Sequence, residues 1–188
     1  MPVADRALML INEQGVYGSL GCHPKCAAQG AWSESLERTI RDMVERAGSG
    51  KVVAIGECGL DYSQPFFAKE SELQKSVFID QIQMALDLKL PLVMHSRDAS
   101  EDSFKILQEH IPSDYPVHHH CFTGSVEEMK KWHFAFPGMS FGFTPCVMYR
   151  NPQLQETIVE VPIDSESFVF FLSWWFSCCC FVRTTFRN

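Results

Sequence analysis

Five residues whose side chains could take part in chemistry stand at equivalent places along the chain, each at or just beyond the end of a short apolar segment. They are His23, Glu57, His95, His120 and Thr144. If these segments are parallel strands, their carboxyl ends meet on one face, where side chains from several strands converge. One carboxylate and two imidazoles suit a divalent metal, because the carboxylate supplies a hard oxygen and the imidazoles supply nitrogens of borderline softness. Such an ion activates water and polarises a phosphoryl oxygen, so metal-assisted hydrolysis is the leading hypothesis.

Strand-like and helix-like segments alternate along the chain. Apolar, turn-bounded runs predict strands at residues 15–22, 51–55, 91–95, 117–121 and 139–143. Helical periodicity and capping residues predict helices at residues 32–47, 69–89, 100–110, 125–134 and 154–159. This order predicts an α/β fold with a parallel sheet, either a (β/α) barrel or a doubly wound open sheet.

The placement of the candidate residues separates these two folds. A doubly wound dinucleotide fold concentrates its signal in one glycine-rich turn after the first strand, whereas a barrel spreads it over several strand ends. The first such turn, at residues 21–24, reads GCHP. Residues 48–51, GSGK, lack the spacing of a phosphate loop and precede a strand. We therefore exclude both nucleotide loops and expect an incomplete (β/α)8 TIM barrel of the metal-dependent hydrolase type.

Not every polar residue near a strand end is a candidate ligand. His118, His119 and His120 are adjacent, but strand alternation sends His119 to the opposite face from the other two. We expect at most His120 to bind metal, with His118 pointing the same way from a deeper layer. Asp61 and Arg97 lie just beyond Glu57 and His95, and fit either a loop ion pair or a contact with substrate.

Composition limits the class of protein. With 188 residues and a formal charge of −7, the chain does not suit broad, non-specific binding of nucleic acid, which needs many basic residues. A phosphate substrate held through a metal remains compatible with this charge. The scattered cysteines include no CxxC pair, and residues 1–13 do not resemble a signal peptide. These features predict a reduced intracellular protein, cytoplasmic or nuclear, with no structural zinc site.

Four motifs together resemble the TatD family of metal-dependent deoxyribonucleases. They are GCHP at residues 21–24, GECGLDY at 56–62, HSRDA at 95–99 and HCFTG at 120–124, in register over about residues 15–161. Within the family the chain looks most like the animal TatD-domain-containing proteins. The resemblance implies a TIM-barrel hydrolase in which two divalent ions (Mg, Mn or Zn) share a water that attacks a DNA phosphodiester.

The resemblance also assigns roles to particular residues. Glu57 matches the catalytic carboxylate that bridges both ions, and His95 and His120 match ligands of the second ion. By the same comparison, His23, Asp61 and Arg97 fall in substrate-facing loops. The acidic surface suits trimming of DNA strand ends rather than wrapping of duplex, and no stable protein partner can be inferred.

The chain also departs from the family pattern. No histidine precedes His23, where the family has a His-x-His pair, and no aspartate follows Asp164, where the family has a further ligand. We expect residues 1–164 to form a partial barrel, cut at both ends, that keeps only the second metal site. A catalytically inactive fragment with a binding or regulatory role is the main alternative. Deacylation or deamination on the same barrel is a weaker one, because fold alone does not determine the reaction.

Residues 165–188 form an atypical tail rich in Cys and Trp. Its uncharged run at residues 168–182 is shorter than the roughly 20 residues of a membrane-spanning helix. The run lacks both the alternation of a half-buried strand and the period of an amphipathic helix. We expect an alternative end in place of the final strands, with membrane association through palmitoylation as the other possibility.

Overall fold

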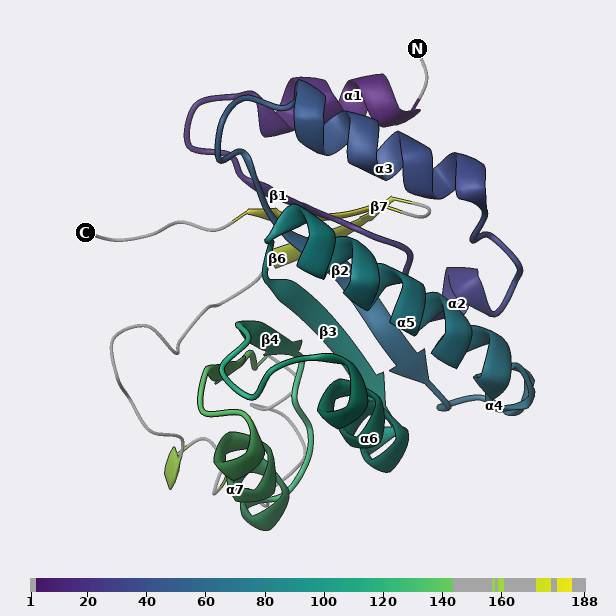
Figure 1. Ribbon diagram of the computed structural model, residues 1–188, viewed down its shortest axis with the longest axis vertical. Coiled ribbons are helices and arrows are strands. Elements are labelled where there is room, and N and C mark those ends of the chain that lie inside the picture. The colour runs from purple at the N-terminus through teal and green to yellow at the C-terminus, as the bar shows by residue number, and fades with distance from the viewer. Residues whose placement is uncertain (1–2, 144–156, 158, 161–171, 177–178, 184–188) are drawn as a thin grey trace.

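The computed structural model describes residues 3–143, 157, 159–160, 172–176 and 179–183. At its centre is a parallel sheet whose five strands lie side by side in chain order (Figure 1). Successive strands are joined through helices, the kind of crossover that parallel strands require. The strands are β1 (Gly18–Leu20), β2 (Val52–Asp61), β3 (Leu92–Arg97), β4 (Val117–His120) and β5 (Met139–Phe141).

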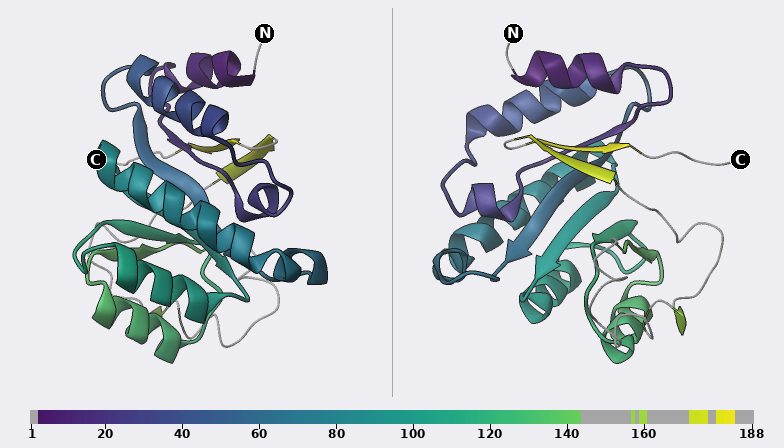
Figure 2. Two further views of the ribbon diagram at one scale, coloured as in Figure 1. Left: turned by 45° about the vertical axis from the view of Figure 1, so that its right-hand side comes forward. Right: turned by 180° about the vertical axis from the view of Figure 1, so that it is seen from behind.

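The helices cover one face of this sheet, as the two further views make clear (Figure 2). They are α1 (Val3–Ile11), α2 (Pro24–Ala27), α3 (Glu34–Arg46), α4 (Pro65–Lys69), α5 (Ser71–Leu88), α6 (Ser100–His110) and α7 (Val126–Ala135). A curved parallel sheet with helices on its outer side is part of a (β/α) barrel, so the predicted fold class is confirmed.

The core lies between the sheet and these helices. Leu20, Ile55 and Met94 come from three successive strands, and Phe78 and Ile82 come from α5. All five side chains are completely buried and belong to one cluster. Because these side chains pack the strands against α5, the carboxyl ends of the strands are held at fixed separations.

The second strand is longer than the sequence predicts. Glu57 was expected to follow this strand, but β2 continues to Asp61, so Glu57 lies within it. The expectation followed the apolar run, which stops at Ile55. Gly56 and Gly59 have positive φ, 144° and 133°, and a Cβ on either would overlap the main chain of β3. These glycines therefore let β2 run close to β3 rather than ending it.

Most of the predicted helices are confirmed, and three helices form that were not predicted. Ser33 and Ser125 cap α3 and α7, each hydroxyl accepting a 3.2 Å hydrogen bond from the main-chain N–H three residues later. The helix predicted at residues 69–89 is α5, whereas the short helices α2 and α4 were not predicted. No helix was predicted before residue 15, yet α1 forms there and buries Ala7 and Ile11.

The tail contains regular structure that the sequence did not indicate. β6 (Leu172–Phe176) and β7 (Cys179–Arg183) form an antiparallel hairpin, so strands form here in a run that lacks the alternation of a half-buried strand. β7 lies beside β1, on the face of the sheet opposite the helices (Figure 2). Thr144 and most of the helix predicted at 154–159 lie outside the described residues. In the part that is described, no helix has the length and apolar character needed to cross a membrane.

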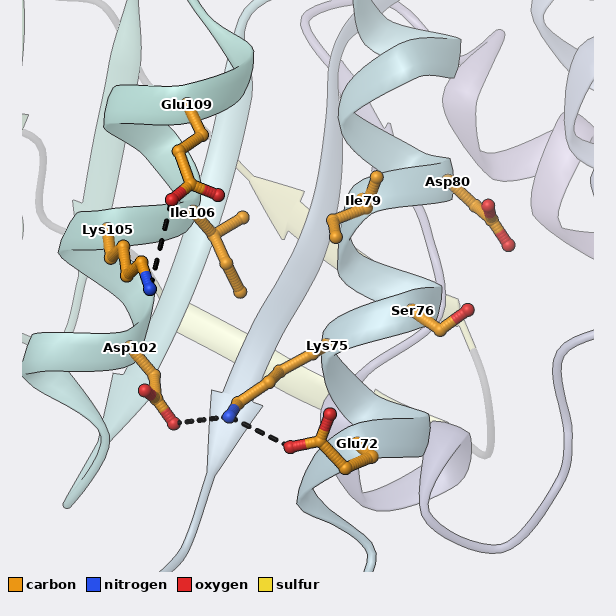
Figure 3. A pocket seen from close by; sticks show the side chains of 9 residues that line it. All are labelled: Glu72, Lys75, Ser76, Ile79, Asp80, Asp102, Lys105, Ile106 and Glu109. Atoms are coloured by element: carbon orange, nitrogen blue, oxygen red, sulfur yellow. Dashed lines mark hydrogen bonds and ion pairs between the residues drawn. The ribbon is translucent and has the colours of Figure 1, made fainter.

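Charged side chains tie the end of β2 to two helices at the surface. The Lys75 ammonium lies 3.0 Å from Glu72 Oε1 and 2.9 Å from Asp102 Oδ2 (Figure 3). The Tyr62 hydroxyl, directly after β2, donates a 2.8 Å hydrogen bond to the same Asp102 oxygen. Glu72, Lys75 and Asp102 line a groove between α5 and α6 on the outer helical surface. The groove is therefore a structural junction, separate from the strand ends that carry the candidate residues.

Candidate metal centre

Glu57 is the carboxylate around which the candidate residues gather. It is buried, and its Oε1 lies 2.8 Å from Nδ1 of His95. The same oxygen lies 3.8 Å from Nε2 of His120 and 3.9 Å from Nε2 of His23. Three imidazoles, from the turn after β1 and from β3 and β4, thus converge on one oxygen atom of a side chain in β2.

Strand register explains how His95 and His120 come together. The two residues are register partners in the parallel pair β3–β4, so their side chains leave neighbouring strands at the same height. In the pair β2–β3, His95 is opposite Gly59, two residues after Glu57. Because Gly59 has no side chain, the main chain of His95 approaches β2 closely and its ring reaches the Glu57 carboxylate.

His23 reaches the site from the turn after β1. It caps the short helix α2, and its Nδ1 accepts a 3.1 Å hydrogen bond from the main-chain N–H of Lys25. This bond directs Nε2 toward Glu57. The His23 ring also packs edge-on against the His95 ring, with centroids 4.7 Å apart. The prediction placed His23 in a substrate-facing loop, whereas the structure brings it into contact with the metal-site candidates.

Asp61 is a second buried carboxylate at the same site. Its Oδ2 lies 3.3 Å from Nε2 of His95 and 3.5 Å from the Lys25 ammonium. Its Oδ1 accepts hydrogen bonds from both the main-chain N–H and the hydroxyl of Ser63, at 3.0 and 2.5 Å. The His95 ring therefore lies between the Glu57 and Asp61 carboxylates, with one ring nitrogen facing each.

The local electrostatics give these side chains distinct charges. Although burial opposes its ionisation, the hydrogen bond from His95 lowers the pKa of Glu57 to about 2. Burial, together with nearby His95, lowers the pKa of His23 to about 4. Burial also lowers the pKa of His120. Burial acts against the charged form of His95 too, but its bonds to Asp61 and Glu57 raise its pKa. At neutral pH, Glu57 is therefore anionic, and His23 and His120 are neutral imidazoles with electron pairs available.

This donor set fits a divalent metal ion. In the described part of the chain, donor atoms of His23, Glu57 and His95 all lie within 4.8 Å of one another. Ligand atoms of one tetrahedral zinc ion are roughly 3.4 Å apart, so the donor atoms are close to the spacing of a single metal site. Nε2 of His120, 3.8 Å from Glu57 Oε1, is as near to this carboxylate as His23 is, so either imidazole could complete the set. A carboxylate with neutral imidazoles is also the ligand chemistry that such ions prefer.

Comparison with known proteins shows which family the sequence matches. The sequence profile of the family described as TatD related DNase matches residues 3–166. The chain belongs to the TatD family. The resemblance predicted from the four motifs is therefore confirmed over most of the chain's length.

Several TatD relatives show clear sequence identity. The human 3'-5' RNA nuclease TATDN2 is 40% identical over 159 residues, which cover 82% of this chain and 20% of TATDN2. The metal-dependent hydrolase YabD of Bacillus subtilis is 36% identical, covering 87% of this chain and 61% of YabD. The 3'-5' ssDNA/RNA exonuclease TatD of Escherichia coli is 34% identical, covering 79% of this chain and 54% of that protein. The chain thus spans about a fifth of one relative and somewhat over half of the other two.

Solved TatD structures share the fold. The crystal structure of YjjV, a TatD homologue from Escherichia coli, superposes with a TM-score of 0.74 at 27% identity, covering 88% of this chain and 61% of YjjV. A TatD family hydrolase from Entamoeba histolytica gives a TM-score of 0.67 at 25% identity, over 81% of this chain and 48% of that one. These likenesses place the five-strand sheet as part of a TatD barrel.

The two histidines that precede the motif HCFTG, His118 and His119, follow the predicted alternation. His118 and His120 lie on one face with ring centroids 6.3 Å apart, and Nδ1 of His118 is 2.9 Å from the Ser140 hydroxyl. His119 lies on the other face in the core, with its ring edge-on to Trp132 and Phe122. His119 is therefore part of the packing beneath α7.

Two further positions complete the comparison with the prediction. Arg97 is the last residue of β3, in register with Asp61, and its side chain is exposed at the mouth of the TatD barrel. Lys25 was missed, although its ammonium pairs with Asp61. Lys25 follows His23 by two residues and comes directly after Pro24, the first residue of α2. This position is the only signal in the sequence that could have indicated it.

Proposed function

We propose that this chain hydrolyses phosphodiester bonds at the ends of nucleic acid strands, using one divalent ion held by Glu57, His95 and His120. The observation that carries the proposal is the approach of His95, from β3, and His120, from β4, to the Oε1 atom of Glu57 in β2. The names of the relatives, which describe 3'-5' nucleases of RNA and of single-stranded DNA, support the substrate class.

The chain's own residues have separable tasks in this proposal. Glu57 keeps a negative charge inside the site, because its pKa is lowered to about 2. Asp61 orients the His95 ring by accepting a hydrogen bond at Nε2. Arg97, exposed at the end of β3, has the planar geometry to grip a substrate phosphate. When bound, a divalent ion would supply polarisation of the phosphoryl oxygen and a water of lowered pKa.

His23 has a different task from the three proposed ligands. The hydrogen bond from Lys25 fixes its ring, and its neutral Nε2 faces Glu57. We assign His23, Asp61 and Arg97 to the substrate-binding side. Because the site lies in an acidic chain, we expect it to act on accessible strand ends rather than within long duplexes.

The test is a cleavage assay with the purified chain. Single- and double-stranded DNA and RNA, labelled at either end, are incubated with Mg²⁺, Mn²⁺ or Zn²⁺ in turn. We expect stepwise shortening from strand ends that requires a metal and is lost in Glu57→Gln and His95→Ala. Matched controls are Glu109→Gln and His110→Ala, which change the same residue types in α6 away from the site.

Two results would contradict the proposal. Cleavage that survives both site substitutions would mean that the metal is held elsewhere. Metal binding by the parent chain without cleavage of any substrate would instead favour the predicted alternative, a catalytically inactive member of the family that binds or regulates.

A further inference from the structure

Helix α5 carries two glutamines that are completely buried, Gln74 and Gln81. They are seven residues apart, so they lie on the same side of the helix, about two turns from each other. Each side-chain amide pairs with both main-chain groups of a single residue at a strand end. The two contacts have the same pattern but hold different strands.

Gln81 holds the end of β1. Its Oε1 accepts a 2.6 Å hydrogen bond from the main-chain N–H of Cys22, and its Nε2 donates a 3.1 Å bond to the Cys22 carbonyl. Cys22 directly precedes His23. A Cβ on Gly21 would lie 2.9 Å from Gln81 Oε1 and 2.8 Å from Gly56 Cα. The amide therefore fits there only because residue 21 has no side chain.

Gln74 holds the end of β2 in the same way. Its Oε1 accepts a 2.8 Å hydrogen bond from the main-chain N–H of Asp61, and its Nε2 donates to the Asp61 carbonyl at 3.2 Å. A further 2.6 Å bond from Nε2 to the carbonyl of Phe67 fixes the amide against α4. The main chain that carries the Asp61 carboxylate is thus tied to α5.

These contacts occur where strand pairing stops. β1 and β2 are paired only as far as Leu20 and Ile55, where the ladder between them ends, although Gly21 still lies close to Gly56. Buried main-chain groups need partners wherever a neighbouring strand no longer supplies them. The glutamine amides supply these partners for Cys22 and Asp61. The distance between the two strand ends is therefore set by one rigid helix.

We propose that Gln81 and Gln74 are positioning residues, which hold His23 and Asp61 respectively at the separation that the metal site requires. Gln74 acts on His95 as well, because the Asp61 carboxylate contacts Nε2 of that ring. The inference rests on the proposed function for the roles of these residues. It goes beyond it by assigning the geometry of the site to α5, which contributes no ligand.

The first test is a histidine side-chain NMR experiment on the full metal-free chain. Gln81→Met and Gln74→Met remove the amides while nearly preserving length, and Gln83→Met makes the same change at an exposed position of α5. Gln81→Met should shift the ring resonances of His23 but leave those of His120 in place. Gln74→Met should shift those of His95, and Gln83→Met should shift none.

The second test measures metal affinity by titration with Mn²⁺, followed by electron paramagnetic resonance. We expect the affinity to fall about 10- to 100-fold in Gln74→Met and to stay unchanged in Gln83→Met, since residues that orient ligands have effects of this size. In an Asp61→Ala background, Gln74→Met should cause no additional shift of the His95 resonances, because its effect passes through the Asp61 carboxylate. If a methionine variant does not fold, Gln74→Asn or Gln81→Asn takes its place. Asparagine keeps a polar amide but is one methylene shorter, so the amide is withdrawn from the main-chain groups that it contacts.

The outcomes separate this inference from the proposed function. Shifts of all the site histidines alike in both variants would indicate a general structural role and overturn the inference. Equal effects of Gln83→Met and the buried substitutions would do the same. A chain that binds Mn²⁺ and shows the selective shifts, but cleaves no substrate, would support the inference while contradicting the proposed nuclease function.

Discussion

His95 joins two carboxylates of one strand: its Nδ1 lies 2.8 Å from Glu57 Oε1, and its Nε2 lies 3.3 Å from Asp61 Oδ2. Both ring nitrogens are thereby oriented before any metal arrives. Such preorganisation reduces the cost of ordering ligands on binding, and a carboxylate partner on the second nitrogen is typical of metal-binding histidines. We expect metal affinity to depend most on Glu57, because His95, His120 and His23 all face its buried carboxylate.

Replacing Glu57 by Gln should weaken Mn²⁺ binding by at least about 100-fold, because it removes the buried negative charge while preserving side-chain shape. Loss of a residue that only orients a metal ligand weakens metal binding by about 10- to 100-fold, and loss of the ligand's own charge should weaken it at least as much. Calorimetric titration of the parent and the variant measures the change. Glu109→Gln, at an exposed carboxylate of α6, controls for loss of one charge. Equal affinity of Glu57→Gln and the parent would refute a metal site centred on this carboxylate.

His23 and His120 should respond differently to substitution, although both lie just under 4 Å from Glu57. We expect His120→Ala to lower Mn²⁺ affinity by about 10-fold or more. His23→Ala should leave that affinity within a few fold and act mainly on KM for a labelled oligonucleotide, because His23 is assigned to the substrate side. The opposite pattern would exchange their roles and make His23 the ligand.

The sequence predicted the order of the strands, but neither the ends of β2 and β3 nor how closely the strands approach. His95 and His120 were recognised because each closes an apolar run, and parallel register then brings them together. Glu57 was placed after its strand because the apolar run stops at Ile55, whereas the glycines beyond it admit the main chain of β3 and β2 continues. The contact between His23 and Glu57 depends on the separation of β1 from β2, which no local pattern encodes. The hairpin at β6 and β7 arises in a run with neither helical nor strand periodicity.

The link between Asp102 and Lys75 should make stability depend on acid pH. The Lys75 ammonium, and then the Tyr62 hydroxyl, lower the pKa of Asp102 below its ordinary 3.8. A carboxyl whose pKa is lower in the folded state stabilises the fold above its unfolded pKa, and that contribution is lost as pH falls through the folded value. We expect Asp102→Asn to cost less than about 1 kcal/mol at pH 7, because the pair is partly exposed and screened.

The measurement compares urea unfolding of the parent and Asp102→Asn from pH 7 downward. The difference in free energy should hold constant to about pH 5 and disappear below the folded pKa of Asp102. Glu109→Gln removes a carboxylate that lies 3.9 Å from the Lys105 ammonium, so it should have little effect at any pH. A difference for Asp102→Asn that persists undiminished at pH 2 would show that the ion pair is not its cause.

Gly59 should be the glycine whose substitution most directly damages both stability and the site. Its φ of +133° is unfavourable for other residues, and an added Cβ would overlap the carbonyl oxygen of His95. We expect Gly59→Ala to lower the free energy of unfolding by about 3 kcal/mol or more, combining backbone strain with overpacking.

Gly50→Ala is the matched control, because its φ of +70° gives strain alone, with no atom near the new Cβ, and should cost about 1 kcal/mol. Denaturant unfolding of both variants, with the His95 ring resonances recorded in parallel, tests this. Equal costs, or an unchanged His95 signal in Gly59→Ala, would mean that the close approach of β2 and β3 does not shape the site.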